Sequence, residues 1–405
     1  MMTIVKIAWR NIWRTPLRSM VVISSIVLGI WAGIFVIAFC YGLNKQRTVN
    51  RIESAVSHIQ IHHPEFEKYF ETKYTLENPV ALEKKLEANP FIKSFALRSL
   101  QIGMISSAIK SNGVQIIGVN KAQEKEVTNL YSKLTEGTYF DAKRKNAILI
   151  GEVLAKKLNV RMRSKVVLTF QDNENNIVSG AFRVCGIFKT QYSKYDESHV
   201  FIENSDLHRL IQSEGYHQAA LICHSINQVE ATLGRLETDL QNYTVKDWKK
   251  ISPELAYADE VMETWLLLIM VIIMLALIFG IINTMLMVVF ERRKELGMLM
   301  AIGMNKSKVF ALILVETFLL SLVGAPTGML LAVMTIHLTS YTGIDLSIVG
   351  DGLQSVGLSN IIYPVIQPKF YFLTGLMVFL FTLISAIYPS KKALRLKPAE
   401  AIRTI

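Results

Sequence analysis

Four long stretches without a charged residue are the feature that most constrains this chain. They are Ser19–Asn44, Thr264–Phe290, Thr317–Ile344 and Phe370–Ser390. Each reaches the roughly 20 residues that an α-helix needs to cross about 30 Å of hydrocarbon. The first is too long for the apolar core of a cleaved signal peptide, so we expect it to be retained. The sequence therefore predicts four transmembrane helices, at 19–44, 261–290, 309–338 and 370–390.

The segment between the first two spans, residues 45–260, is long enough to bury a core of its own. From Asn44 to Glu260 it carries 29 Lys and Arg against 26 Asp and Glu, whereas the whole chain has a net charge of +11. Most of the excess positive charge therefore lies elsewhere. We expect residues 45–260 to form a separate domain, called here the outer domain.

The remaining basic residues cluster beside the predicted spans. They are Lys6, Arg10, Arg14 and Arg18 before the first span, Arg292, Arg293, Lys294, Lys306 and Lys308 between the second and third, and Lys391, Lys392, Arg395, Lys397 and Arg403 after the fourth. Only Lys369, before the fourth span, lies on the opposite side. The positive-inside rule then predicts cytoplasmic termini and an extracytoplasmic outer domain in an inner-membrane protein. Because orientation and anionic lipid explain these cations, they do not indicate nucleic-acid binding.

The same topology assigns the shorter segments. Residues 1–18 have one apolar and one basic helical face, which predicts an amphipathic helix in the membrane interface. Residues 291–308 become a cytoplasmic connection, residues 339–369 an extracytoplasmic loop and residues 391–405 a cytoplasmic tail. From Ser252 a helical pattern runs directly into the second span, so we expect the outer domain to rest on stalk helices.

The outer domain alternates strand and helix patterns. Strands are predicted at 57–62, 94–109, 114–119, 147–150, 165–171, 177–188, 200–202 and 219–223, and helices at 45–55, 80–87, 152–158, 205–212 and 227–240. We expect Asn112-Gly113 to form the turn between the second and third strands. The predicted fold class is an α-helical membrane protein with four transmembrane helices plus a mixed α+β extracytoplasmic domain inserted between helices 1 and 2.

Sequence motifs for enzymatic chemistry are absent: no G-x-x-x-x-G-K-[ST] loop, G-x-S-x-G or H-E-x-x-H occurs. We therefore expect a non-catalytic chain without a bound cofactor or metal, and any ATPase must be a separate chain. His58, His62 and His63 have no Cys or carboxylate at ligand spacing, so we favour surface-strand histidines over a metal site. Cys185 and Cys223 could form a disulfide or be unpaired core residues.

Small and ionisable residues mark two features of the spans. Four glycines have the spacing of close helix packing, within the chain or with a second copy: Gly29 and Gly33 in the first span, and Gly324 and Gly328 in the third. Pro326, between the last two, removes a backbone donor and predicts a kink. Glu316 is expected near the cytoplasmic interface, paired or solvated.

The connection after the second span is the most informative stretch. Residues 291–306, called here the elbow, read ERRKELGMLMAIGMNK. We predict a charged helix with Leu296, Leu299 and Met300 on one face, ended by Gly303, and a new helix after Asn305. Such an elbow could dock into a groove of a cytoplasmic partner, and a solvated loop is the alternative. The candidate residues are Glu291, Arg292, Arg293, Lys294, Glu295, Leu296, Gly297, Leu299, Ala301, Gly303 and Lys306.

Residues 291–303 resemble the cytoplasmic coupling segment of the FtsX and MacB superfamily of ABC permeases. The C-terminal tail of that superfamily is similar to Tyr388-Pro389, 391–393 and 397–403. Its N-terminal helix is similar to Ala8–Asn11 with Arg14. The outer domain is similar to that of the LolC and LolE lipoprotein-releasing branch at five places: 58–61, 118–119, Gly137, 151–158 and 182–188. Residues 161–165 depart from the Val-Gly-Asp turn that many relatives have there.

The resemblance implies a complex of two permeases, identical or homologous, with a dimer of cytoplasmic ABC ATPase subunits that bind ATP and Mg. ATP-driven closure of that dimer would move the stalks and outer domains, a mechanism called mechanotransmission. The lipoprotein-releasing branch implies transfer of lipoproteins from the inner membrane to a periplasmic carrier. The alternatives are MacB-like export of a peptide or drug, FtsX-like control of a cell-wall hydrolase, and, from another class, a membrane receptor or scaffold without an ATPase.

Overall fold

The computed structural model describes residues 2–14, 16–140, 146–174, 176–355 and 357–394. The chain divides into two compact units. The helical unit comprises Met1–Asn44, Glu260–Asp345 and Ile361–Ile405, and the outer unit comprises Lys45–Asp259 and Leu346–Asn360. Part of the predicted cytoplasmic tail, residues 395–405, lies outside the described residues.

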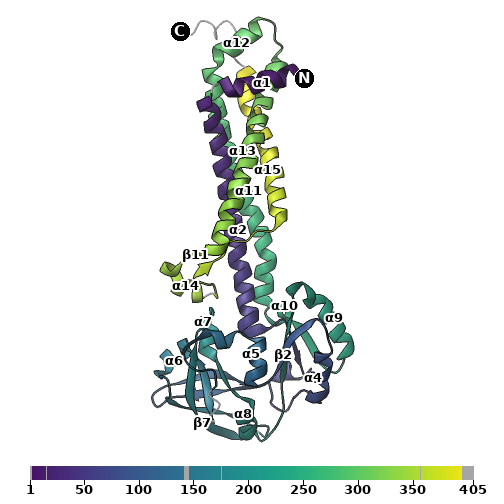
Figure 1. Ribbon diagram of the computed structural model, residues 1–405, viewed down its shortest axis with the longest axis vertical. Coiled ribbons are helices and arrows are strands. Elements are labelled where there is room, and N and C mark those ends of the chain that lie inside the picture. Colours follow the sequence, from purple (N-terminus) through teal and green to yellow (C-terminus); the bar gives the residue numbers. More distant parts are fainter. Residues whose placement is uncertain (1, 15, 141–145, 175, 356, 395–405) are drawn as a thin grey trace. The chain divides into compact units, whose positions relative to one another are not determined.

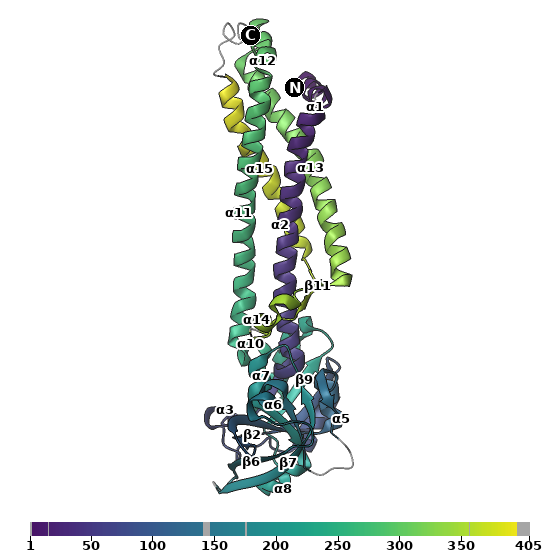
Figure 2. The same ribbon diagram turned by 90° about the vertical axis from the view of Figure 1, so that its left-hand side faces the viewer.

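Four helices of the described residues are long and apolar enough to cross a bilayer. They are α2 (Pro16–Arg51), α11 (Pro253–Glu291), α13 (Lys306–Thr342) and α15 (Pro368–Leu394). Within the helical unit these helices run side by side in both ribbon views (Figures 1 and 2). The unit boundaries fall inside α2 and α11, so each of these two helices contributes residues to both units.

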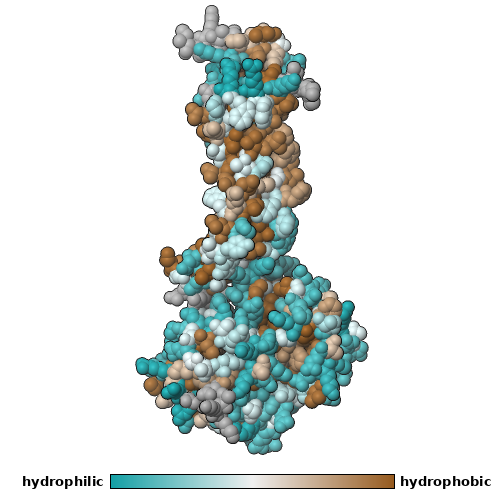
Figure 3. All heavy atoms as spheres, in the orientation of Figure 1, coloured by the Kyte–Doolittle hydropathy of each residue, from teal (hydrophilic) through white to brown (hydrophobic). Residues whose placement is uncertain are grey.

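The core of the helical unit follows the helical period. Ile26, Ile30 and Ile34 of α2 recur at spacings of four and are fully buried in one cluster with Met270 and Met274 of α11. Apolar side chains on the opposite faces stay exposed, and Figure 3 shows hydrophobic residues along the surface of the long helices. A bundle that is apolar outside as well as inside is suited to hydrocarbon as its solvent.

Two shorter helices belong to the same unit. Helix α1 (Met2–Arg14) contacts α13, with Ala8 and Ile12 buried and Trp9 and Trp13 exposed. Helix α12 (Arg293–Ala301) joins α11 to α13. Helix α13 is assigned as one continuous helix through Pro326.

The outer unit has a mixed sheet of ten strands within the described part of the chain. The strands are β1 (Ile59–His62), β2 (Ile92–Ser106), β3 (Ser111–Val119), β4 (Leu134–Gly137), β5 (Ala147–Gly151), β6 (Lys165–Gln171), β7 (Ile177–Phe188), β8 (His199–Glu203), β9 (Gln218–Cys223) and β10 (Thr244–Asp247). The spatial order is β10-β1-β9-β2-β3-β8-β5-β7-β4, and β6 pairs with β2 and β7. The β3–β8 and β5–β7 pairs are parallel and the others antiparallel.

Short helices cover this sheet. They are a π-helical turn at Ile52–Val56, α3 (Phe66–Tyr69), α4 (Pro79–Glu87), α5 (Lys121–Val127), a 3₁₀ turn at Leu130–Lys133, α6 (Glu152–Leu158), α7 (Ser193–Ser198), α8 (Asn204–Ile211), a 3₁₀ turn at Ile226–Gln228, α9 (Val229–Asp239) and α10 (Trp248–Ile251). Local sequence explains several starts. Asn78 accepts a hydrogen bond from Ala81 N and precedes Pro79, and Asp247 caps α10 through Lys250 N.

The predicted turn at Asn112-Gly113 is wrong. Both residues lie inside β3, where Gly113 pairs with Met104 of β2. The chain reverses instead at Ser107–Lys110, where Ser107 N donates to Lys110 O at 2.8 Å. The Ser107 hydroxyl also accepts from Lys110 N at 3.1 Å, a local turn that replaces the one expected from Asn-Gly.

The segment expected as a loop, 339–369, contains its own short elements. Strands β11 (Ile344–Asp345) and β12 (Ile361–Ile362) pair with each other, and a 3₁₀ turn (Ser347–Val349) and α14 (Gly350–Ser355) lie between them. Within the outer unit, α14 contacts α7.

Candidate functional site

The elbow is a short helix between two changes of direction. Helix α11 ends at Glu291, α12 follows, and Gly303 has a φ of +100°, a left-handed conformation that glycine adopts without steric cost. Asn305 then caps α13, because its side-chain oxygen accepts from Ser307 N at 3.3 Å. Helix α12 lies at one end of the helical unit (Figure 1).

A buried ion pair fixes the start of the elbow to α13. Arg292 Nη1 donates to Glu316 Oε1 at 2.8 Å and to Oε2 at 2.9 Å, and the two side chains are 11% and 8% exposed. Arg292 Nε donates to Glu295 Oε2 at 3.1 Å, and Glu295 also lies 3.8 Å from Arg14 of α1. The Arg292–Glu316 pair, called here the clamp, therefore joins α12 to α13.

One candidate residue of the elbow, Leu296, faces the interior of the helical unit. Leu296 is only 2% exposed and belongs to the core of the helical unit, so a partner cannot contact it. Exposed apolar side chains lie elsewhere: Met298 is 55% and Ile302 is 79% exposed. With the exposed Lys294 they are spaced four residues apart, and we call Lys294, Met298 and Ile302 the elbow face.

The other candidate elbow residues divide by exposure. Glu291, Glu295, Ala301, Gly303 and Lys306 are exposed, Arg293 and Leu299 are half-buried, and Gly297 is buried. The i, i+4, i+8 spacing of the elbow face was available in the sequence. Which apolar face of α12 turns inward depends on packing against the other helices, so sequence periodicity alone did not identify it.

The four candidate glycines lie at contacts between helices of one chain. A Cβ at Gly29 would collide with Leu277 of α11, and one at Gly324 would lie 2.9 Å from Ile26 of α2. At Gly33 the neighbour is Ile273, and at Gly328 a Cβ would lie 2.9 Å from a backbone oxygen of α2. These small residues therefore allow α11 and α13 to approach α2 closely within the chain.

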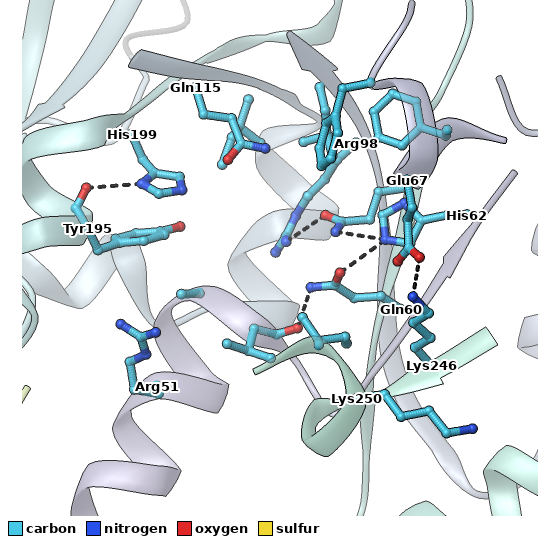
Figure 4. A pocket seen from close by; sticks show the side chains of 18 of the residues that line it. Arg51, Gln60, His62, Glu67, Arg98, Gln115, Tyr195, His199, Lys246 and Lys250 are labelled. Atoms are coloured by element: carbon cyan, nitrogen blue, oxygen red, sulfur yellow. Dashed lines mark hydrogen bonds and ion pairs between the residues drawn. The ribbon is translucent and has the colours of Figure 1, made fainter. Parts of the chain in front are cut away.

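The outer unit contains a cavity of about 480 Å³, open to solvent on one side, that no sequence motif indicated. Figure 4 shows polar side chains from several strands and helices pointing into it. Beside it, the buried Arg98 guanidinium donates to both oxygens of Glu124, at 2.9 and 2.7 Å, and to Gln218 Oε1 at 3.1 Å. Because Arg98 and Glu124 are 3% and 0% exposed, this pair anchors β2 to α5 in the interior.

The interpretation of His62 as a surface histidine is wrong. Strand β1 lies between β10 and β9, and His62 is 4% exposed, with Nδ1 3.0 Å from His217 O and Nε2 3.1 Å from Gln60 Oε1. Burial lowers the pKa of His62 to about 4, which keeps it neutral. Among the described residues, no group of three His, Cys, Asp or Glu side chains has metal-binding geometry. Cys185 and Cys223 are buried in separate clusters and are not joined by a disulfide, and the Cys185 thiol donates to Ile148 O at 3.3 Å.

Comparison with known proteins gives matches to both parts of the chain. Residues 19–238 match the MacB-like periplasmic core domain, and residues 267–398 match the FtsX-like permease C-terminal family. The lipoprotein-releasing system transmembrane protein LolC of Haemophilus influenzae is 23% identical over 395 residues, 93% of this chain and 91% of the relative. LolE of the same organism is 21% identical over 417 residues, 98% of each chain.

Two further matches extend the comparison. An uncharacterized ABC transporter permease of Methanocaldococcus jannaschii is 22% identical over 416 residues, 99% of this chain and 97% of the relative. The crystal structure of the periplasmic region of MacB from Actinobacillus actinomycetemcomitans covers 52% of this chain and 98% of that one, at 14% identity and a TM-score of 0.36. Since the MacB-like match alone spans more than half of the 405 residues and the FtsX-like match covers most of the rest, this chain belongs to the FtsX and MacB family of ABC transporter permeases.

Proposed function

We propose that this permease transmits the motion of a cytoplasmic ATPase to the outer unit, and that the motion releases lipoproteins from the inner membrane. Membership of the family implies an ATPase partner and a second permease. The match to relatives named for lipoprotein release extends over nearly the whole chain, which supports this class of cargo and a periplasmic carrier that receives it. The chain itself then needs no catalytic residue.

The elbow face carries the proposal. Met298 and Ile302 are large apolar side chains exposed at the end of a helix, and the charged residues around them, including Lys294 and Lys306, keep the elbow out of the hydrocarbon. An apolar pair rimmed by charges is suited to a groove on a protein partner. The basic residues beside the spans support a cytoplasmic elbow by the positive-inside rule, on the side where the proposed ATPase would bind.

The clamp and helix α11 give a physical route for the motion. Helix α11 extends without interruption from Pro253, a residue of the outer unit, to Glu291 at the elbow. The clamp holds Arg292 on α13, so a push on α12 displaces α11 and α13 together instead of bending the connection between them. Helices that move as rigid bodies are an established means of transmitting a displacement.

The decisive experiment replaces the two apolar residues of the elbow face. Met298→Asp combined with Ile302→Asp puts charge into the proposed contact, and it should abolish copurification of the ATPase with the permease and abolish lipoprotein release. Ile177→Asp is the matched control, because Ile177 is a 76% exposed apolar residue of the outer unit and does not belong to the elbow. Both variants should elute as folded protein from size-exclusion chromatography. Retention of the ATPase by the double variant would refute the assignment of the elbow.

A second measurement separates the possible cargoes. Photo-crosslinking from the outer unit in native membranes should capture acylated protein. Captured peptides or drugs without acyl chains would favour export, and a cell-wall hydrolase would favour its control. If no ATPase copurifies with the unaltered chain, the receptor or scaffold alternative holds.

A further inference from the structure

The cavity in the outer unit has no role in the proposed transmission of motion, and charged side chains line part of its wall. Its volume of about 480 Å³ lies in the range of roughly 300–1,000 Å³ typical of small-molecule sites. Four cationic side chains line it, Arg51, Arg98, Lys246 and Lys250, against a single carboxylate, that of Glu67. The balance of charge at the cavity wall is therefore positive.

Each of the four cations has a carboxylate neighbour. Arg98 is neutralised by Glu124 in the buried bidentate pair, and Lys246 forms an ion pair with Glu67. Lys250 lies 3.4 Å from Glu237, and both side chains are about half exposed to water. Arg51 is also paired, with Glu254 of the same unit, but among these cations it is the one whose guanidinium keeps a nitrogen without a hydrogen-bond partner among the described residues.

Arg51 is a buried cation with an incomplete set of partners. Its side chain is 13% exposed, and its Nη2 lies 3.2 Å from Glu254, which is itself 59% exposed. The Nε atom is buried and has no hydrogen-bond partner in the part of the chain that the structure describes. The guanidinium stacks 3.8 Å from the centroid of the Tyr192 ring, which fixes its orientation at the cavity wall.

Neutral polar groups face the same space. Figure 4 shows Arg51, Tyr195 and His199 together on one side of the cavity, with Gln115 nearby. Tyr195 and Gln115 both line the cavity, and burial raises the pKa of Tyr195, so its hydroxyl remains a donor. His199 also lines the cavity, and its Nδ1 lies 2.8 Å from Ser198 Oγ and 3.2 Å from the Tyr195 carbonyl oxygen.

The rest of the wall is apolar and partly aromatic. Phe66, Phe70, Leu100 and Ile117 line it together with Tyr192. Such a surface would contact a flat apolar body, while a buried guanidinium and a hydroxyl donor would bind an acidic group. We propose that this cavity binds a small organic anion, a carboxylate or phosphate attached to an aromatic or cyclic body, with its acidic group on Arg51.

Occupancy would involve the two helices that join the units. Arg51 is the last residue of α2, and Glu254 lies in the first turn of α11. An anion on Arg51 competes with Glu254 for the same guanidinium. Removal of the Glu254 carboxylate should therefore strengthen anion binding, an effect that a merely structural role of Arg51 does not predict.

The test uses the full-length chain in lipid nanodiscs and ligand-observed ¹⁹F NMR, with empty nanodiscs as the blank. 4-Fluorobenzoate and 4-fluorophenyl phosphate are the anionic probes, and 4-fluorobenzyl alcohol is the neutral control. At least one anion should show saturable line broadening, and the alcohol should show none. Saturable binding of the alcohol equal to that of the anions, or binding of neither anion, would overturn the proposal.

Variants locate the binding. Arg51→Met should weaken the anion's affinity by about tenfold or more, as expected for loss of a hydrogen-bonded charge. Tyr195→Phe should weaken it about threefold or more, and Glu254→Gln should strengthen it. Lys165→Met is the matched control, because it removes one positive charge from an exposed position on β6, outside the cavity, and should change nothing. If Arg51→Met fails to fold, unchanged affinity in both Tyr195→Phe and Glu254→Gln would still overturn the proposal. The outcome is independent of the cargo proposed above.

Discussion

Breaking the clamp should destabilise the helical unit by an amount that the structure allows us to bound. Glu316→Leu leaves the Arg292 guanidinium 11% exposed and without the two bonds of 2.8 and 2.9 Å, with only the half-exposed Glu295 as a carboxylate neighbour. Arg292→Met leaves the Glu316 carboxylate 8% exposed. Removal of one partner of a buried pair costs roughly 3–5 kcal/mol, because the remaining charge is neither solvated nor compensated.

The double variant distinguishes an ion-pair effect from a loss of packing. Arg292→Met with Glu316→Leu leaves no buried charge and keeps two long side chains, so its cost should be smaller than that of either single variant. The measurement is denaturant unfolding of the purified protein in mixed micelles, followed by tryptophan fluorescence. The exposed pair Lys369–Glu263 of the same unit, with side chains 51% and 53% exposed, is the matched control and should contribute at most about 0.5 kcal/mol.

Two outcomes would refute the reasoning about the clamp. Single variants that each cost less than about 1 kcal/mol would show that the charges are solvated. A double variant whose cost equals the sum of the two single costs would show that Arg292 and Glu316 act independently.

Two further predictions concern the outer unit. Glu124→Gln leaves the buried Arg98 without its carboxylate, so it should lower the free energy of unfolding by roughly 3–5 kcal/mol in denaturant titration. The same change at the exposed Glu126 should lower it by at most about 0.5 kcal/mol. Equal losses at the two positions would contradict the buried pair. Burial lowers the pKa of His62 and of His199 to about 4, below the ordinary 6.5, so the unfolded chain takes up protons first as the pH falls. His217 shifts in the same direction, whereas Asp196, whose pKa burial raises to about 6, opposes the trend in part. The free energy of unfolding should therefore fall on balance between pH 6.5 and 4, and a flat profile measured by denaturant titration would contradict neutral, buried histidines.

The parts of the fold with strong local signals were predictable from sequence. Uncharged runs identified the four long helices, and the buried run Ala147–Gly151 followed by an amphipathic pattern identified β5 and α6. Strands β4 and β10 were missed because each has four residues and neither shows a clear period. The Asn112-Gly113 turn failed because strand pairing and the Ser107 side chain determine where β2 and β3 reverse.

The candidate site was predictable in outline but not in orientation. Gly303 and Asn305 indicated where α12 ends and α13 begins. Leu296 and Met298 are both apolar, so only packing within the helical unit decides that the first is buried and the second exposed. The cavity had no sequence signal, since its lining residues are scattered from Arg51 to Ile251 and meet only through the sheet.

The side of the membrane on which each part lies is the condition for the whole account. Single cysteines introduced by Lys294→Cys in the elbow and Ile177→Cys in the outer unit can be tested with a membrane-impermeant thiol reagent, with the unaltered chain as the blank for its own three cysteines. In spheroplasts the reagent should label the cysteine at 177 and not the one at 294. In inverted vesicles it should label the cysteine at 294 and not the one at 177. Labelling of both positions from one side would contradict transmission of motion across the membrane.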